Sequence, residues 1–251
     1  MKFNDLAIES IAYELPPVTV STEQLVRRLD PVFRRFKIPV DAMLQLTGII
    51  ERRFWTHGHP MHQAATDVAR RAIQRAGITP DKVGILISTS VSKDYLEPSM
   101  ASLVHGDLGL GPECRNFDLA NACLGFLNGI EVAGRLIESG VADYALLVDG
   151  ESAGSVVEAT ITRLQDPSTT LRDFWEAFAT LTLGSAAVAM VLTRGSLSQT
   201  THRVNGCVSL ADTANSRLCM GTAERMVTDS TRLLKAGVVL AQKTWGVASN
   251  Q

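Results

Sequence analysis

Apolar residues follow two patterns along the chain, and these patterns predict strands that alternate with helices. Short unbroken apolar runs are typical of strands buried on both faces, and apolar residues every three or four positions are typical of helices. Strands are predicted at residues 3–13, 83–88, 116–119, 144–148, 186–192 and 204–210. Helices are predicted at residues 22–36, 41–46, 62–76, 100–108, 124–140 and 226–247. Because the strands are not amphipathic, we expect helices on both faces of a sheet, which makes the fold class α/β.

Two segments in the second part of the chain carry separate expectations. Residues 153–179 are mostly polar and contain Pro167, so they are predicted to form an irregular excursion over the surface. The long helix at 226–247 is predicted to turn an apolar face inward, and that face comprises Leu233, Leu234, Gly237, Val238 and Ala241.

Composition and charge exclude several classes of protein. The 251 residues include 24 basic and 26 acidic side chains, 45% are hydrophobic and 20% are charged. A net charge of −2 argues against a nucleic-acid-binding protein, and the apolar fraction argues against a disordered chain. No run approaches the roughly 18 apolar residues of a membrane span, and acidic residues near the start do not fit a secretory signal. The protein is therefore expected in the cytoplasm.

The four cysteines fit neither a disulfide framework nor the spacing of a metal site, so they are expected to be reduced thiols. Three histidines in the segment HGHPMH could bind a metal, but no acid or cysteine completes the ligand set and a solvated loop is the simpler explanation. We therefore predict no metal site.

Cys123 is the cysteine whose position suggests chemistry. It lies in the segment FDLANACLGF, where a predicted buried strand passes into a predicted helix. Unpaired N–H groups at a helix N-terminus favour the thiolate, and the small neighbours Ala122 and Gly125 would let a substrate approach closely. A small buried side chain is the alternative explanation, because that is the commonest role of a free cysteine.

The same segment, FDLANACLGFLNGIE, resembles the nucleophile segment of the thiolase superfamily, in the branch of the ketoacyl-acyl-carrier-protein synthase III enzymes. Further segments that resemble this branch in the same order are TGIIERRFW, VGILISTSVSKDYLEPSMAS, DYALLVDGES and LTLGSAAVAMVL. Within the superfamily, YLEPS followed by NACLGF, and RMVTDSTRLLKAGVVLAQKTW near the end, are similar to the family that opens bacterial long-chain olefin biosynthesis, the OleA family. The resemblance implies that Cys123 is the catalytic nucleophile.

Glu97 distinguishes this resemblance from a typical synthase III enzyme, where the residue before the Pro-Ser pair is apolar. A synthase III enzyme makes its carbanion by decarboxylation, whereas joining two fatty acyl thioesters requires removal of an α-proton by a general base. An apolar acyl channel would raise the pKa of Glu97 to roughly 6–7, which suits that role. The alternative explanation for Glu97 is a solvated loop acid close to Lys93 and Asp94.

The resemblance also implies an architecture: a thiolase-like fold of two similar halves in five layers, αβαβα. Residues 1–195 would form a complete first half that carries the nucleophile, and residues 196–251 the incomplete start of the second half. The family's catalytic His and Asn would then lie beyond residue 251. The implied assembly is a homodimer in which Glu97 reaches the partner's site.

The implied activity is that of an acyltransferase in lipid metabolism. It would condense two long-chain acyl-CoA molecules without decarboxylation, through an acyl-Cys123 intermediate, to a 2-alkyl-3-oxo fatty acid. CoA thioesters would be its substrates and no metal or redox cofactor would be needed. Two alternatives remain at this point, a decarboxylating 3-oxoacyl-carrier-protein synthase III of fatty acid synthesis and a truncated inactive remnant.

Overall fold

The computed structural model describes residues 1–250, which form two compact units interleaved in the sequence. The first unit, here called the sheet unit, comprises residues 1–15, 58–151 and 186–207. The second, here called the helical unit, comprises residues 16–57, 152–185 and 208–250. Neither unit is one continuous stretch. The predicted division at residue 195 concerns two halves of a repeated fold rather than compact units, and it stays a prediction.

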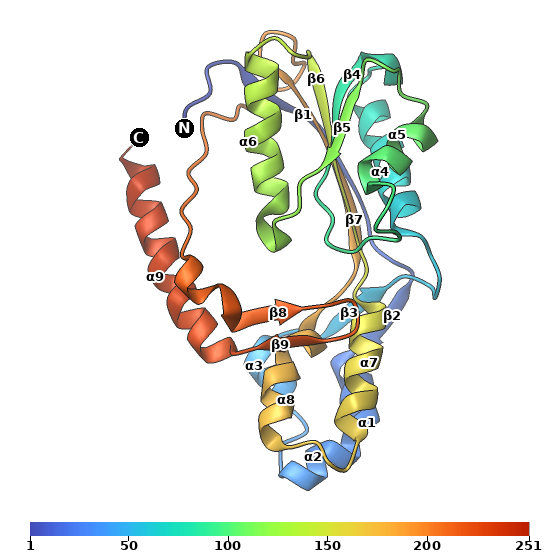
Figure 1. Ribbon diagram of the computed structural model, residues 1–251, viewed down its shortest axis with the longest axis vertical. Coiled ribbons are helices and arrows are strands. Elements are labelled where there is room, and N and C mark those ends of the chain that lie inside the picture. Colours follow the sequence, from blue (N-terminus) through green and yellow to red (C-terminus); the bar gives the residue numbers. More distant parts are fainter. Residues whose placement is uncertain (251) are drawn as a thin grey trace. The chain divides into compact units, whose positions relative to one another are not determined.

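The sheet unit is built on a five-stranded sheet with the order β1-β7-β6-β4-β5 (Figure 1). Its strands are β1 (Leu6–Glu14), β4 (Val83–Ser88), β5 (Arg115–Asp118), β6 (Tyr144–Glu151) and β7 (Ala186–Arg194). Strand β4 pairs in parallel with β5 and β6, whereas β7 pairs antiparallel with β6 and β1. The ends of three parallel strands therefore meet at one edge, which is where open α/β sheets place their binding sites.

Helices cover both faces of this sheet, as the buried apolar runs predict. Helices α4 (Met61–Arg75) and α5 (Met100–Leu108) lie on one face, and α6 (Gly125–Glu138) lies on the other (Figure 1). Alternate residues of a strand point to opposite faces. Ile85, Ile87 and Leu147 accordingly pack in one buried cluster with Ile130 and Ile137 of α6. The predicted α/β class is confirmed.

The helical unit has its own apolar core and two short pairs of strands. Its elements along the first part of the chain are β2 (Val18–Ser21), α1 (Thr22–Arg28), α2 (Asp30–Phe36), α3 (Ala42–Thr47) and β3 (Glu51–Phe54). Later elements are α7 (Gly154–Gln165), α8 (Leu171–Ala177), β8 (Cys219–Gly221), β9 (Met226–Thr228) and α9 (Ser230–Ser249). Phe33 and Phe174 meet edge to face at 5.6 Å in the core. No helix within residues 1–250 combines the length and the apolar character that a membrane crossing requires.

The prediction of an irregular surface excursion at residues 153–179 is wrong. The segment forms α7 and α8, and Val157, Ile161 and Leu164 of α7 are buried in the core of the helical unit. Their spacing of four and three positions places them on one face of a helix. Pro167 only separates the two helices, and a capping box between Thr170 and Asp173 starts α8.

The strand predicted at residues 204–210 is also absent as a regular element. Residues 203 and 206 make only isolated bridges, to Ala7 and Lys2. The facing chain bends between these two bridges, at Asn4 and Asp5, where the Glu138 carboxylate accepts both backbone N–H groups. A bent edge cannot present a continuous ladder of hydrogen bonds to a neighbouring strand.

The last predicted helix begins later than expected. Met226–Thr228 is strand β9, and Asp229 then caps α9 by accepting from the backbone N–H of Arg232. The face predicted to point inward is exposed instead, with Leu234 69% exposed, so this prediction is wrong for the described residues. The same face lines a shallow apolar groove together with Ala179 and Thr228.

Candidate active site

Cys123 lies at the edge of the sheet where the parallel strands end. A short 3-10 turn, Ala122–Leu124, follows β5 and leads directly into α6. The thiol is free and exposed, so the alternative of a small buried side chain does not apply within the described chain. The first turn of α6 has no side-chain cap, and the backbone N–H groups of Leu124 and Gly125 donate to the backbone oxygens of Asn121 and Ala122. The positive end of the helix dipole lies beside the thiol.

The backbone at this turn adopts a conformation that few residues tolerate. Ala122 has φ +44°, in the left-handed region that side chains beyond glycine rarely enter. Nearby, a Cβ at Gly125 would lie 3.1 Å from the backbone oxygen of Thr89 and 3.3 Å from that of Leu119. The first turn of α6 thus rests directly on the ends of two strands. Such local strain concentrates at functional sites, where the surrounding structure holds one residue in a fixed place.

Glu97 lies on the loop between β4 and α5, residues 89–99, here called the Glu97 loop. Its side chain is exposed, and its neighbour Leu96 is 98% exposed. The apolar surroundings predicted for Glu97 are therefore not supplied by the described residues. No hydrogen bond or ion pair within residues 1–250 joins Glu97 to Cys123, and the role of each side chain stays a prediction at this point.

Carboxylates fasten the Glu97 loop to the rest of the sheet unit. Asp94 accepts from the backbone N–H groups of Met61 and His62, both at 2.8 Å, and lies 2.7 Å from Nδ1 of His62. Burial acts to raise the pKa of Asp94, but the N–H groups of His62 and Met61 outweigh it and the pKa is lowered. Asp118 accepts from Lys93 Nζ at 2.7 Å and from the backbone N–H of Ala101 at 2.8 Å.

Sequence reasoning missed these anchoring carboxylates. In the sequence, Asp94 is only a neighbour of Glu97, and neither Asp118 nor Glu151, which accepts from the loop at Val91 and Ser92, was predicted to hold it. The available signal was Asp118, an acid within the strand predicted at residues 116–119, near the edge where parallel strands bring side chains together. Glu151 lies beyond the strand predicted at residues 144–148 and becomes a strand end only in the longer β6. The same omission affected His62, which is engaged by Asp94 rather than lying in a free loop.

The other three cysteines lack the setting of Cys123. Burial raises the pKa of Cys114 to about 11, and burial also raises the pKa of Cys207. Cys219 is exposed, and its sulfur lies 3.3 Å from Oγ1 of Thr228. A thiol with a raised pKa is a poor nucleophile near neutral pH. Within residues 1–250, no group of three or more His, Cys, Asp or Glu side chains is arranged to hold a metal ion.

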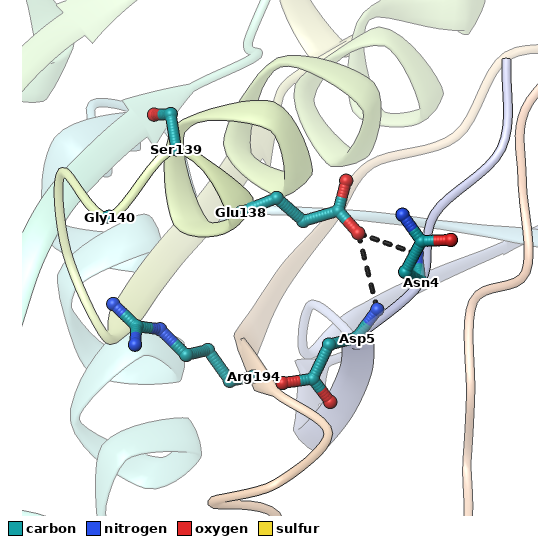
Figure 2. A pocket seen from close by; sticks show the side chains of 6 residues that line it. All are labelled: Asn4, Asp5, Glu138, Ser139, Gly140 and Arg194. Carbon is teal, nitrogen blue, oxygen red and sulfur yellow. Dashed lines mark hydrogen bonds between the residues drawn. The ribbon is translucent and has the colours of Figure 1, made fainter.

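A polar hollow of about 510 Å³ lies at the other end of α6, away from Cys123 (Figure 2). It is lined by Asn4, Asp5, Glu138, Ser139, Gly140 and Arg194. A helix of 14 residues is about 20 Å long, so this hollow is remote from the nucleophile. Its acidic residues are already engaged with backbone N–H groups and with Arg135.

Comparison with known proteins identifies the class of protein to which this fold belongs. The family model of 3-oxoacyl-[acyl-carrier-protein] synthase III matches residues 117–213, a stretch that includes the Cys123 turn and α6. Crystal structures of OleA from Xanthomonas campestris, a thiolase-fold enzyme, superpose on the chain. One histidine variant has a TM-score of 0.96 and 43% identity, and the match covers 100% of this chain and 74% of that one. The chain is therefore an acyltransferase of the thiolase superfamily.

Individual relatives narrow the assignment. The acyl-CoA:acyl-CoA alkyltransferase of Xanthomonas campestris pv. campestris is 44% identical over 251 residues, which cover 100% of this chain and 74% of the relative. The enzyme of the same name from Shewanella oneidensis is 39% identical over 258 residues, covering 98% and 73%. The chain belongs to the acyl-CoA:acyl-CoA alkyltransferase family. A cysteine variant of the Xanthomonas enzyme, solved with lauric acid and lauroyl-CoA, matches with a TM-score of 0.95 and 42% identity over 99% of this chain and 74% of that one.

Proposed function

We propose that this enzyme joins two long-chain fatty acyl-CoA molecules by a Claisen condensation that needs no decarboxylation. The observation that supports the proposal is the position of the Glu97 carboxylate. It stands on an exposed loop, in the same unit of the fold as an exposed cysteine at the head of a helix. A condensation that starts from two ordinary acyl thioesters requires a nucleophile and a separate base for a carbon-bound proton.

The first half of the reaction transfers an acyl group to Cys123. The thiolate attacks the carbonyl carbon of the first acyl-CoA, the bond to the CoA sulfur breaks, and CoA leaves as its thiolate. The N-terminus of α6 favours the charged sulfur before attack. We expect the backbone N–H of Cys123 to donate to the carbonyl oxygen as negative charge develops there.

The second half forms the new carbon–carbon bond. Glu97 of the partner subunit takes a proton from the α-carbon of a second acyl-CoA. The resulting enolate carbon attacks the thioester carbonyl on Cys123 and expels the thiolate. Hydrolysis of the remaining CoA thioester gives a 2-alkyl-3-oxo fatty acid, which suits olefin formation. The acyl carbonyl and the base supply the chemistry, so no metal or redox cofactor enters this scheme.

The relatives support these two roles. Variants of the Xanthomonas enzyme were solved with substitutions at one glutamate and at one cysteine. Those two positions stand as far apart in that sequence as Glu97 and Cys123 do here. A histidine substituted in other variants lies farther from that cysteine than Gln251 lies from Cys123. This agrees with the expectation that the catalytic His falls beyond residue 251.

A homodimer in the cytoplasm is the setting that we infer for this reaction. Tyr95 and Leu96 are exposed apolar residues beside Glu97, which suits a loop inserted into a partner subunit. All four cysteines are free, as is usual in a reducing compartment.

The test uses purified full-length enzyme and a single long-chain acyl-CoA, with no malonyl substrate present. We expect a 2-alkyl-3-oxo product by mass spectrometry. Glu97→Gln should lower condensation by about 10²–10⁴-fold while acylation of Cys123, read by intact protein mass, continues. Cys123→Ala should abolish both. Product that appears only when a malonyl thioester is added would instead support the decarboxylating alternative, and equal loss of both steps in Glu97→Gln would contradict the role of Glu97.

A further inference from the structure

The Glu97 loop is hydrogen-bonded to a carboxylate close to the point where it leaves the sheet. Glu151, the last residue of β6, accepts from the backbone N–H of Val91 at 2.6 Å and from that of Ser92 at 3.1 Å. Its second oxygen also accepts from the Ser92 hydroxyl at 2.5 Å. Three hydrogen bonds to one carboxylate thus hold the third and fourth residues of the loop against the end of the adjacent strand.

The same edge of the sheet also supports the nucleophile. Leu147, Asp149 and Glu151 alternate along β6 and share one face, which is the face that α6 covers. Thr89, at the start of the Glu97 loop, donates through Oγ1 to Asp149 at 2.7 Å.

Thr89 also packs closely against two glycines of α6. Its methyl group would lie 3.1 Å from a Cβ at Gly129, and its backbone oxygen 3.1 Å from a Cβ at Gly125. The helix that Cys123 precedes and the loop that carries Glu97 are therefore both held by the ends of β4 and β6.

We propose that Glu151 is a positioning residue for the condensation step, because its carboxylate fixes where the loop bearing the general base leaves the sheet. This role rests on the function proposed above. Asp94 holds a later part of the loop to α4, and Asp118 of β5 binds Lys93, whereas Glu151 holds Val91 and Ser92, which are closer to the end of β4. The carboxylate of Glu151 touches no substrate in this scheme and acts through its hydrogen bonds to the backbone of the loop and to the Ser92 hydroxyl.

The expected consequence is selective. A displacement of a catalytic group by about 1 Å can lower a rate by roughly 10²-fold, so loosening the loop should slow proton removal by Glu97. The acylation of Cys123 does not use Glu97 and should continue. A general loss of folding would lower both steps together, and the ratio of the two rates therefore separates positioning from stability.

The test is Glu151→Gln in the full-length enzyme, with palmitoyl-CoA as the only substrate. The amide keeps the shape of the side chain but replaces one acceptor oxygen by a donor, so at least one of the three hydrogen bonds is lost. We expect condensation to fall about tenfold or more relative to wild type, with acylation within about twofold. Acylation is read as CoA release in a single turnover and condensation as β-keto product.

Glu138→Gln is the matched control. Glu138 also clamps two consecutive backbone N–H groups, those of Asn4 at 2.5 Å and Asp5 at 3.2 Å, but at the other end of α6 (Figure 2). The Glu138→Gln variant also loses a carboxylate that accepts from backbone N–H groups. We expect its acylation and condensation rates to stay within about twofold of wild type.

Ser92→Ala is the second variant, chosen because it removes the hydroxyl contact and leaves the carboxylate of Glu151 in place. It should lower condensation about threefold to tenfold and leave acylation unchanged. Equal loss of both steps in Glu151→Gln, or condensation no slower than in Glu138→Gln, would overturn the proposal. If wild-type enzyme forms no product from palmitoyl-CoA alone, the proposed function fails first and this role fails with it.

Discussion

Asp149 is the residue whose environment most affects the charge balance near the site. The pKa of Asp149 is raised to about 6. Burial is the main cause and the nearby Glu151 adds to it, whereas the hydrogen bond from Thr89 acts to lower the pKa. In the unfolded chain an aspartate ionises near 3.9. The folded protein therefore binds this proton more tightly than the unfolded chain does. By linkage, the free energy of unfolding should decrease as the pH rises from about 4 to about 6 and then stay level.

Replacing this carboxylate by a neutral amide should remove that decrease. The introduced amide oxygen can still accept from Thr89, so Asp149→Asn keeps the local packing. We expect the free energy of unfolding to rise by about 1–3 kcal/mol at pH 7.5 and to change little at pH 4. Urea denaturation followed by circular dichroism at both pH values measures this. A shift of the same size at both would mean that the effect comes from packing and not from charge.

At the level of elements, the junction of β4, β5 and α6 is too tight to take a side chain at Gly125 without a shift of the neighbouring backbone. A Cβ there would meet the backbone oxygens of Thr89 and Leu119 at 3.1 and 3.3 Å, and backbone atoms can yield only by moving the strand or the helix. The first turn of α6 carries Cys123 at its head, so any such movement also displaces the thiol.

Gly125→Ala should therefore lower the rate of Cys123 acylation by about tenfold or more. Gly106→Ala is the matched control, since Gly106 lies within α5 and a Cβ there has no neighbour within 4 Å. Alanine in place of a helical glycine stabilises by roughly up to 1 kcal/mol, and we expect that control to acylate at the wild-type rate. Both rates come from CoA release in a single turnover. Similar losses in the two variants would argue that the packing of Gly125 does not set the position of the thiol.

The elements that the sequence predicts best are those whose own pattern decides them. The strand at residues 83–88 and the helix at residues 100–108 have the predicted bounds, because an unbroken apolar run and a helical stripe with a Gly109 end are local signals. Helices α7 and α8 were not predicted, because polar residues surround their short apolar stripe and because Pro167 indicates a break in helical structure. The late start of α9 depends on Asp229 and on the pairing of β9 with β8, which no periodicity records.

The candidate site likewise contains residues that have a local sequence signal and contacts that only the fold creates. Cys123 can be predicted from a local motif at a strand–helix junction, and Glu97 from a resemblance. The clamp by Glu151 joins residues 59 and 60 positions apart, and only the folded sheet brings them together. Hydrogen bonds of that sequence separation leave no trace in hydrophobic periodicity. The exposure of Glu97 agrees with the alternative of a solvated loop acid, whereas no pattern in the chain predicts the exposure of Leu96.

For the whole molecule, the central question is which subunit supplies the base. Glu97 stands beside the fully exposed Leu96 and the exposed Tyr95, and such a projecting apolar turn is suited to burial against a second copy. The resemblance likewise implies that the base acts across a homodimer. The proposed first half at residues 1–195 carries both Cys123 and Glu97, so each subunit would give its base to its partner and receive one in return.

Mixing two inactive variants tests this exchange directly. Cys123→Ala retains Glu97, and Glu97→Gln retains Cys123. If the base acts across the dimer, a mixed dimer contains one site with both groups. The purified mixed dimer should then condense at about half of the wild-type rate, because one of its two sites is complete. The variants are co-expressed with different tags and the mixed dimer is purified through both. If Glu97 served its own subunit, no site in the mixed dimer would hold both groups, and condensation would remain at the level of the parent variants.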